Sequence, residues 1–572
     1  MKLRNLMWGA CACILATGCS NDDVAVENSN VITNADGESY MAVRIVAAND
    51  GMSRATSPGF DDGDNTEGGV TSAVFYFYDG NGNYVTKGST ASMSATTQDP
   101  ADDNVERISN VVVVLRDVTE TPAQVIAIVN GGESTALDAK FENKSLTQAM
   151  SELLEGAEEY SYTTTGEGEG QTSATYFRMS NSTYMNGTTI CCATPLSTQN
   201  LQPSEDLAED YPVDIYVERL AAKVQLLEDE NLDENIEDVT NVTVDGTANQ
   251  TLEITVDKWG LSAINKEAYY LKNLDNTWTE ATLWSGWNAS NYSRSYWAKD
   301  PNYSSGNYPT NYNGWNTQEE THWDLDYLTY AELDKNPGES DYCLENTVDA
   351  ITLDYTNGIN TSAVTHLLIA ATMKVKPTEG EGTAQTLYRY KGAFYTEDNY
   401  IAAALSDWEA LGTIIYTATP GGEGTTYSPL AATDVEIVNK GDGKVNIKLT
   451  DDAKAETWYT LSGEGDSQIA TEYPGNLDEL FNDLSDADGF KDGKMYYCVP
   501  IEHLNTTAGA VGNYGVVRNH WYQLTLESIS GLGHAVYDPD EEIIPNYNPE
   551  TYYVAARLNI LSWKVVNQSV KL

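Results

Sequence analysis

Residues 110–130 read NVVVVLRDVTETPAQVIAIVN, and this stretch decides the fold class. Two apolar runs rich in β-branched residues, 110–116 and 123–130, are separated by a polar segment that contains Pro122. Runs of this length and composition, bounded by turn residues, are typical of strands at the centre of a sheet. We therefore predict two central strands here and a fold built mainly from β-structure.

The same pattern recurs along the chain. Residues 70–79 (VTSAVFYFYD) are followed by the turn sequence Gly80–Asn83. Helices are expected only at 146–154, with Ser145 as the N-cap, and at 476–484. Further strands are expected at 84–85, 213–226, 251–256, 365–375, 393–395, 445–449, 494–500 and 521–526. Many short strands joined by turns predict β-sandwich domains with a few short helices.

Composition limits the class of partner. The chain has 572 residues, enough for two or three domains, and carries 86 Asp and Glu against 32 Lys and Arg, a formal net charge of -54. Such a surface repels nucleic acid and anionic membranes, so neither is expected as a partner. The cysteines beyond the N-terminal region follow no zinc-binding spacing and are expected to be buried thiols, with a Cys343–Cys498 bridge left open: Cys191, Cys192, Cys343 and Cys498.

The N-terminus predicts export as a lipoprotein. Lys2 and Arg4 precede a short apolar stretch, and the sequence LATGC ends at Cys19. Small residues directly before a cysteine suit a lipoprotein signal peptidase, and the apolar stretch is too short for a permanent membrane anchor. We therefore expect a signal peptide at 1–19, fatty acylation (palmitate) on Cys19 and a polar tether that starts at residue 20.

Catalytic and metal-binding motifs do not stand out from the background. No nucleophile elbow, phosphate loop or dinucleotide motif lies between a strand and a helix. His366 lies in an apolar run and is expected to be a core residue, while Asp61–Glu67 lacks the full calcium-loop register and is expected to be a solvated acidic loop. We expect no enzyme activity, no cofactor and no metal site.

Residues 278–323 form an aromatic insert, rich in Trp, Tyr, Asn and Gly. Aromatic faces flanked by amides can bind sugars, because rings stack on apolar C–H faces while amides bond the hydroxyls. The favoured interpretation is a long loop whose aromatic residues pack on the C-terminal domain. The alternative interpretation, a glycan-binding loop, stays open.

A strand near the N-terminus precedes an exposed basic residue. Residues 39–50 (SYMAVRIVAAND) alternate, and their apolar face holds Met41, Val43, Ile45 and Ala47. Arg54 and Ala55 follow in a stretch rich in Ser, Gly and Asp, where an Arg-specific protease could cut. Cleavage there removes both the lipid and this strand, and leaves an open hydrophobic groove with unpaired backbone groups.

The C-terminus has the complementary pattern. A Pro- and Asp-rich linker is expected at 538–550, and an apolar stretch, 552–572, ends the chain. The apolar residues of this stretch occupy first one face and then the other, which predicts a bulge or a bend between two strands: Tyr552, Val554, Leu558 and Ile560, then Leu561, Trp563 and Val565. A terminal strand after a linker is suited to pairing with another copy of the chain.

Several of these segments together resemble the type V pilins (fimbrillins) of Bacteroidetes, most closely the shaft subunits of short fimbriae. The resemblance covers essentially the whole chain, and its most specific part starts at Tyr496. It is carried by the Cys19 lipobox, 39–55, 123–130, Val217–Arg219, Val516–Tyr522, Gly531–Gly533 and Leu561–Val565.

This resemblance implies two transthyretin-like β-sandwich domains and a structural role in adhesive fimbriae. It implies export to the outer membrane, cleavage between Arg54 and Ala55, displacement of 39–53 and donation of 552–572 to a neighbouring copy. The expected partners are copies of the chain, accessory fimbrial subunits, an Arg-specific protease and surface ligands of host or bacterial cells. The aromatic insert is the departure from the family pattern.

Two alternatives to a shaft subunit stay open. One is a tip or accessory adhesin, and the other is a surface glycan-binding lipoprotein of a polysaccharide-uptake system.

The predicted division of the chain follows from these segments. The expected parts are the signal peptide 1–19, the tether and propeptide strand 20–54, an N-terminal domain 55–225, a C-terminal domain 226–537, and the linker and donor strand 538–572.

Overall fold

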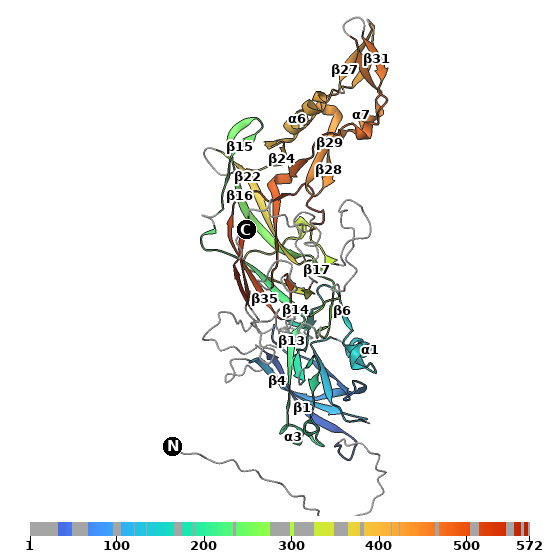
Figure 1. Cartoon of the computed structure of the whole chain (residues 1–572), viewed down its shortest axis with the longest axis vertical. Coiled ribbons are helices and arrows are strands. Elements are labelled where there is room, and N and C mark those ends of the chain that lie inside the picture. The colour runs from blue at the N-terminus through green and yellow to red at the C-terminus, as the bar shows by residue number, and fades with distance from the viewer. Residues whose placement is uncertain are drawn as a thin grey trace, which may run out of the picture.

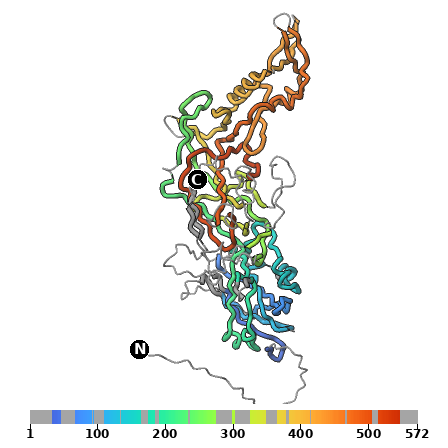
Figure 2. Tube along the Cα trace, in the orientation of Figure 1, coloured from blue at the N-terminus to red at the C-terminus, as the bar shows by residue number. Residues whose placement is uncertain are grey.

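The computed structural model has an elongated shape, with the N-terminal part of the chain at one end (Figures 1 and 2). The fold is mainly β, as predicted, with few and short helices. The described residues are 32–48, 67–94, 105–118, 120–132, 134–164, 174–186, 189–232, 236–274, 298–301, 325–347, 364–377, 382–412, 414–422, 424–463, 468–503, 514–544, 554–561 and 566–569.

The N-terminal domain is a closed barrel of strands. Its sheet runs in the order β12-β5-β2-β3-β4-β1-β13-β9, and pairing of β9 with β5 closes it. The barrel encloses a core of side chains, including Phe75, Val113, Ala127 and Ile215. The two runs quoted first from the sequence are β4 and β5. The strands are β1 (Ser39–Ala48), β2 (Ala73–Tyr78), β3 (Tyr84–Met93), β4 (Val105–Leu115), β5 (Gln124–Val129), β9 (Met179–Asn181), β12 (Thr194–Pro195) and β13 (Val213–Arg219).

One outer face of the barrel is covered by helices α1 (Ser134–Phe141) and α2 (Leu146–Ala149). Ser145 caps α2 as predicted, because its side chain accepts a hydrogen bond from the backbone N–H of Gln148. The predicted helix 146–154 was too long. Residues Leu153–Glu155 instead form strand β6, which pairs with β18 (Glu267–Tyr269) of the second domain. Hydrogen bonding to a strand of the second domain outweighs the helical spacing of the apolar residues here.

The second domain is a sandwich of two sheets. Its core lies between them and holds side chains of both, among them Val224, Leu524, Ile369 and Tyr497. The smaller sheet has the order β20-β14-β35-β37-β38, with β20 (Ser340–Leu344), β14 (Ala221–Glu228), β35 (Trp521–Ile529), β37 (Val554–Leu561) and β38 (Val566–Ser569). The larger sheet has the order β28-β29-β32-β24-β25-β15-β16-β22-β33-β36, with β23 attached to β22.

The strands of the larger sheet are short except for two. They are β15 (Val239–Val244), β16 (Thr247–Ser262), β22 (His366–Lys376), β23 (Thr383–Ala384), β24 (Leu387–Tyr390), β25 (Ala393–Tyr395), β28 (Val435–Gly441), β29 (Lys444–Leu449), β32 (Ala487–Phe490), β33 (Lys494–Pro500) and β36 (His534–Ala535). Cys343 lies in the core between the sheets, whereas Cys498 packs on the outer side of the larger sheet. Both thiols are free, so the bridge left open from the sequence is absent.

The chain passes from the barrel to the sandwich at Leu220, between β13 and β14. The boundary expected from the sequence, between residues 225 and 226, therefore lies inside β14. The predicted linker 538–550 also starts too early. Ile543 is buried and donates its backbone N–H to the carbonyl of Leu328, so the described residues up to 544 pack on the sandwich.

A projecting module, residues 397–484, leaves the sandwich between β25 and β32 (Figure 1). It contains β28 and β29, the helices α6 (Glu397–Ala410) and α7 (Asp451–Ala455), and a sheet of order β27-β26-β30-β31. An apolar core around Tyr400, Trp408 and Trp458 holds its base together. The helix predicted at 476–484 is here only a 3-10 turn, Leu477–Glu479, capped by Asn476.

The remaining short strands form two-residue to four-residue pairs. These pairs are β7 (Ser161–Thr164) with β8 (Ala174–Phe177), β10 (Tyr184–Asn186) with β11 (Thr189–Cys191), β17 (Ile264–Asn265) with β19 (Leu325–Asp326), and β21 (Asn346–Thr347) with β34 (Gly515–Val516). Across the described ranges, no helix has the length and apolar character needed to span a membrane.

Candidate functional site

Strand β1 is an interior strand of the barrel. It pairs antiparallel with β4 along its whole length, from Ser39 opposite Leu115 to Ala48 opposite Val105, and parallel with β13 from Val43 to Ala47. The side chains of Met41, Val43 and Ile45 are at most 1% exposed and belong to the barrel core. Each such side chain stabilises the fold by about 1.5–3 kcal/mol through burial. The side chain of Ala47, the fourth predicted member of this face, lies outside the described residues.

Polar contacts on the outer side of β1 are few and exposed. Arg44 forms a two-pronged ion pair with Asp214 on β13, and its Nη2 atom lies 2.8 Å from the carboxylate. The strand begins beside Glu38, which accepts hydrogen bonds from Tyr40 and Arg116, so that the pKa of the Glu38 carboxyl lies below its ordinary value. Surface pairs of this kind contribute little, so apolar burial and the two ladders hold the strand in place.

The C-terminal hairpin lies at the edge of the smaller sheet. Strand β37 pairs with β35, from Val554 opposite Ile529 to Leu561 opposite Trp521, and β38 pairs with β37. The break between the two strands falls after Leu561, where the apolar pattern of the sequence changes face. The predicted donor residues Val554, Leu558, Ile560 and Leu561 lie on the backbone of β37, and their side chains, like Trp563 and Val565, lie outside the described residues. The processing residues Cys19, Arg54 and Ala55 also lie outside them.

Two segments that carry the resemblance meet at the junction of the domains. Asn519 accepts hydrogen bonds from the backbone and the guanidinium of Arg219, the latter at 3.0 Å. The backbone N–H of Asn519 donates to Ala221, and that of Lys223 donates to His520. The loop before β35 is therefore bonded to the point where the chain crosses from β13 to β14.

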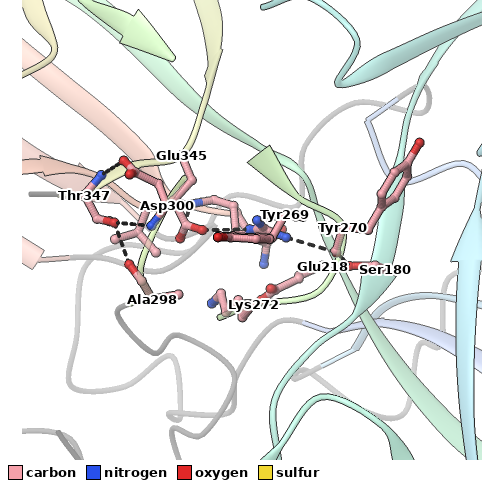
Figure 3. Close-up of polar contacts among 12 residues, drawn as sticks. Ser180, Glu218, Tyr269, Tyr270, Lys272, Ala298, Asp300, Glu345 and Thr347 are labelled. Carbon is pink, nitrogen blue, oxygen red and sulfur yellow. Dashed lines mark hydrogen bonds and ion pairs between the residues drawn. The ribbon is translucent and has the colours of Figure 1, made fainter. Parts of the chain in front are cut away.

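A buried carboxylate next to Arg219 on β13 also belongs to this junction. Glu218 on β13 is 1% exposed and forms an ion pair at 3.1 Å with Lys272, which is fully buried (Figure 3). Ser182 also donates to the Glu218 carboxylate. Burial raises the pKa of Glu218 to about 7, although Lys272 and Arg518 pull it in the opposite direction. The group therefore titrates near neutral pH.

Arg518 completes the network from the sandwich side. Its Nε atom lies 3.1 Å from the Glu345 carboxylate, and its two Nη atoms donate to the backbone carbonyls of Tyr269 and Tyr270. Ser180 of the barrel donates to the same Tyr270 carbonyl (Figure 3). Buried pairs of this kind are costly to break, because removal of one partner leaves an uncompensated charge. The network fixes the barrel against the sandwich.

Glu67 was interpreted wrongly from the sequence as part of a solvated loop. It is 1% exposed, forms an ion pair at 2.8 Å with Lys223, and accepts a hydrogen bond from Tyr342. Lys223 also lies 4.3 Å from the ring centre of Trp521. The sequence carries no signal for this pairing, because the partners are separated by more than a hundred residues. The rest of 61–67 lies outside the described residues.

One short piece of the aromatic insert, residues 298–301, is described. Asp300 accepts hydrogen bonds from Asn265 and from the backbone of Thr347, at 2.8 and 2.7 Å, and Thr347 donates to the carbonyl of Ala298 (Figure 3). These bonds attach this piece of the insert to the sandwich. The six tryptophans of 278–323 lie outside the described residues.

His366 lies in the core, as predicted. Its side chain is buried at the start of β22, where Nδ1 bonds the carbonyl of Val364 and burial lowers its pKa to about 4. The imidazole is therefore neutral at neutral pH. Within the described ranges, no group of three or more His, Cys, Asp or Glu residues is arranged to hold a metal ion.

One family model matches the C-terminal region of the chain. Residues 488–569 match the family model described as "Major fimbrial subunit protein type IV, Fimbrillin, C-terminal". That span contains β33, the Arg518–Asn519 loop, β35 and the C-terminal hairpin. No curated protein matches the sequence.

Solved structures of fimbrial proteins are also similar to the chain. A fimbrilin (FimA) from Porphyromonas gingivalis W83 has 14% identity and a TM-score of 0.34, with 92% of this chain and 98% of that chain covered. The tip fimbrial protein Mfa3 from Porphyromonas gingivalis, with a C-terminal truncation, has 10% identity and a TM-score of 0.32, with 92% and 100% covered. The C-terminal region of this chain, residues 488–569, is therefore similar to the C-terminal part of fimbrillins, which confirms the resemblance to fimbrillins predicted from the sequence.

Proposed function

We propose that this chain is a fimbrial shaft subunit that is exported as a lipoprotein, activated by proteolysis and polymerised by strand exchange. The fimbrillin match supports a structural, non-enzymatic role in a fimbrium at the cell surface. The finer steps rest on the geometry of the two ends of the chain. They also rest on the sequence around Cys19, which predicts acylation and an outer-membrane precursor.

The observation that carries the proposal is the position of β1. It is a strand of a closed barrel, yet its only covalent connection to the other strands of that barrel is the segment 49–66, which contains Arg54. Cleavage after Arg54 cuts the covalent link between β1 and the barrel. Loss of the strand then exposes two ladders, on β4 and β13, and an apolar slot that Met41, Val43 and Ile45 had filled.

The C-terminal hairpin supplies a strand of similar length. Strand β1 has ten residues and β37 has eight, and the predicted donor sequence starts two residues before β37, at Tyr552. In that stretch the residues at alternate positions, Val554, Ala556, Leu558 and Ile560, are apolar. Backbone pairing with β4 and β13 together with burial of alternate side chains is the usual physical basis of strand addition to a sheet.

The two states of the C-terminal strand differ in which strands it pairs with. In its own sheet β37 pairs with β35 on one side and with the edge strand β38 on the other. In the slot of a cleaved neighbour it would pair with β4 and β13 and bury one face in a barrel core. The gross gain from this burial is reduced by the cost of ordering the strand. Before cleavage the slot is filled, so the precursor stays monomeric.

The test is to treat the purified precursor with an Arg-specific protease and to run unboiled denaturing gels beside N-terminal sequencing. The expected result is a new N-terminus at Ala55 and a ladder of multimers that resist detergent. Removal of 552–572 is expected to leave cleavage intact and to abolish the ladder. Multimers of full yield from this truncated chain would disprove the donor assignment.

A matched variant separates cleavage from other effects of the protease. Arg54→Lys keeps the charge but removes the Arg-specific site, so the precursor is expected to stay uncut and monomeric. A Lys-specific protease is then expected to cut it at residue 54 and restore the ladder. Cleavage of wild-type protein at Arg54 without any multimers would instead favour an accessory or tip subunit.

A further inference from the structure

The far end of the projecting module is a sheet with two unlike faces. Its strands are β26 (Tyr416–Gly421), β27 (Gly424–Pro429), β30 (Trp458–Ser462) and β31 (Ile469–Glu472). The register places Tyr416 opposite both Pro429 and Tyr459, and Ala418 opposite Tyr427. Because side chains of a strand alternate between the two sides of a sheet, this register decides which residues share a face.

One side, here called the tyrosine face, is apolar and aromatic. The rings of Tyr427 and Tyr459 lie 5.9 Å apart at 74°, across the strand that carries the small residue Ala418. Leu461 is opposite Ala470 on the same side. The other side carries mainly hydroxyl residues, such as Thr419 and Thr460. The tyrosine face consists of Tyr416, Ala418, Tyr427, Tyr459, Leu461 and Ala470.

The described chain covers the tyrosine face only in part. All six of its residues are half-buried, and none belongs to the apolar core at the base of the module. An antiparallel sheet normally buries its apolar side against a core. In this sheet the buried Trp458 lies on the other side and belongs to the core at the base, whereas the tyrosine face stays partly exposed. The sheet also lies at the end of the molecule opposite the barrel, where another surface can reach it (Figure 1). An exposed apolar patch with a polar surround is typical of a binding site.

The charge of the face selects among binding partners. Strands β26, β27 and β30 contain no charged residue, and the tyrosine face has one carboxylate at its border, Glu472. The whole chain nevertheless carries a formal net charge of -54, so anionic polymers are repelled from this region. An uncharged partner escapes that repulsion. Tyrosine rings stack on the C–H faces of sugar rings, and their hydroxyls bond sugar hydroxyls.

We propose that the tyrosine face binds a neutral polysaccharide chain. Tyr427 and Tyr459 are the stacking residues, and their rings, at 74° to each other, present different surfaces to the sugar units. This binding function does not depend on strand exchange, because the tyrosine face is separate from both β1 and the C-terminal hairpin. It gives the subunit an adhesive surface in addition to its structural role.

Native affinity electrophoresis of the full chain tests the proposal. Gels contain dextran, mixed-linkage β-glucan or galactomannan, and a further gel contains the anionic polymer polygalacturonate. At least one neutral polymer is expected to slow the wild-type protein, and polygalacturonate is not. The double variant Tyr427→Ala/Tyr459→Ala is expected to bind about tenfold more weakly, because it loses two stacking contacts of about 0.5–1.5 kcal/mol each.

Two further variants control for folding and for the opposite face. Tyr427→Phe/Tyr459→Phe keeps the rings and is expected to stay within about threefold of wild type, because stacking dominates. Thr419→Ala/Thr460→Ala alters the same strands on the other side and is expected to change nothing. The proposal is overturned by no retardation on any neutral polymer, by equal retardation of the Tyr→Ala variant with its thermal unfolding unchanged, by retardation on polygalacturonate alone, or by self-association that the Tyr→Ala variant removes.

Discussion

The first strand and the last hairpin of the chain are held in opposite ways. Strand β1 has a hydrogen-bonded neighbour on each side and places Met41, Val43 and Ile45 in a closed core. The C-terminal hairpin is attached to its sheet along one side only, through β37 and β35. The strand with the stronger attachment is the one that precedes the predicted cleavage site, whereas the strand with the weaker attachment is at the free end.

The two attachments decide what each strand needs in order to leave its sheet. A strand inside a closed barrel can leave only if the barrel opens, so its loss needs a covalent cut and a local opening. A hairpin at a sheet edge can peel away while the core between the two sheets stays in place. Under the proposed mechanism, such a subunit would stay inactive until it is cut, and its donor strand would be available from the start.

The largest effect is expected from placing a charge at the inner face of β1. Ile45→Asp puts a carboxylate in the barrel core, where it has no cation, and is expected to destabilise the precursor by more than about 4 kcal/mol. Urea unfolding of the uncut precursor measures this loss. The loss is expected to vanish in the cleaved subunit, because the residue has been removed. An equal loss of stability in the cleaved protein would contradict the proposal that β1 is the displaced strand.

The second effect tests whether the buried ion pair of Glu218 and Lys272 holds the barrel and the sandwich together as one rigid unit. Lys272→Met leaves the buried Glu218 without its nearest cation and is expected to cost about 3–5 kcal/mol in urea unfolding. The control Lys391→Met removes an exposed partner of Asp407 and is expected to cost less than about 1 kcal/mol. A small loss in the first variant would mean that the barrel and the sandwich are joined mainly by apolar contacts.

The third effect is a pH dependence at the same junction. The pKa of Glu218 is raised from 4.5 to about 7, so the protonated form is favoured in the folded state. Its contribution to stability is therefore fully present below about pH 4.5 and is lost as the pH rises through 7. Unfolding measured at several pH values is expected to show this decline in wild type and a weaker decline in Glu218→Gln. Parallel curves for the two proteins would contradict the buried carboxylate as its source.

The smallest effect is expected on the outer side of β1. Arg44→Ala removes the ion pair with Asp214, whose side chains are 45% and 35% exposed. Its cost is expected to lie below about 1 kcal/mol, and to shrink further in high salt. Thermal unfolding at two salt concentrations measures it. A cost comparable to that of a core substitution would show that polar contacts, not burial, hold β1 in the barrel.

The sequence predicted local features better than partners. The two apolar runs at 110–130 became β4 and β5, and Ser145 caps a helix, because burial and capping depend on neighbours in the chain. The change of face after Leu561 marked the break between β37 and β38. These signals are periodic or local, so a single sequence carries them.

Features that depend on distant contacts were missed. The ion pairs of Glu67 and Glu218 join residues far apart, and no local pattern distinguishes these carboxylates from the many exposed ones in so acidic a chain. The helix expected at 146–154 ended early because Leu153–Glu155 pairs with a strand of the other domain. The projecting module and its helix α6 were not predicted from the sequence.

The passage from β13 to β14 has a mechanical consequence. These strands lie in different domains and are separated by Leu220 alone, so a pull along the long axis passes directly through the backbone from one domain to the other. Strand β13 is bonded parallel to β1, and β14 is bonded parallel to β35. Ladders loaded along their strands share the force over all their hydrogen bonds at once, whereas a ladder pulled sideways opens one bond at a time. The connection between the domains is therefore suited to withstand a pulling force along the long axis of the molecule.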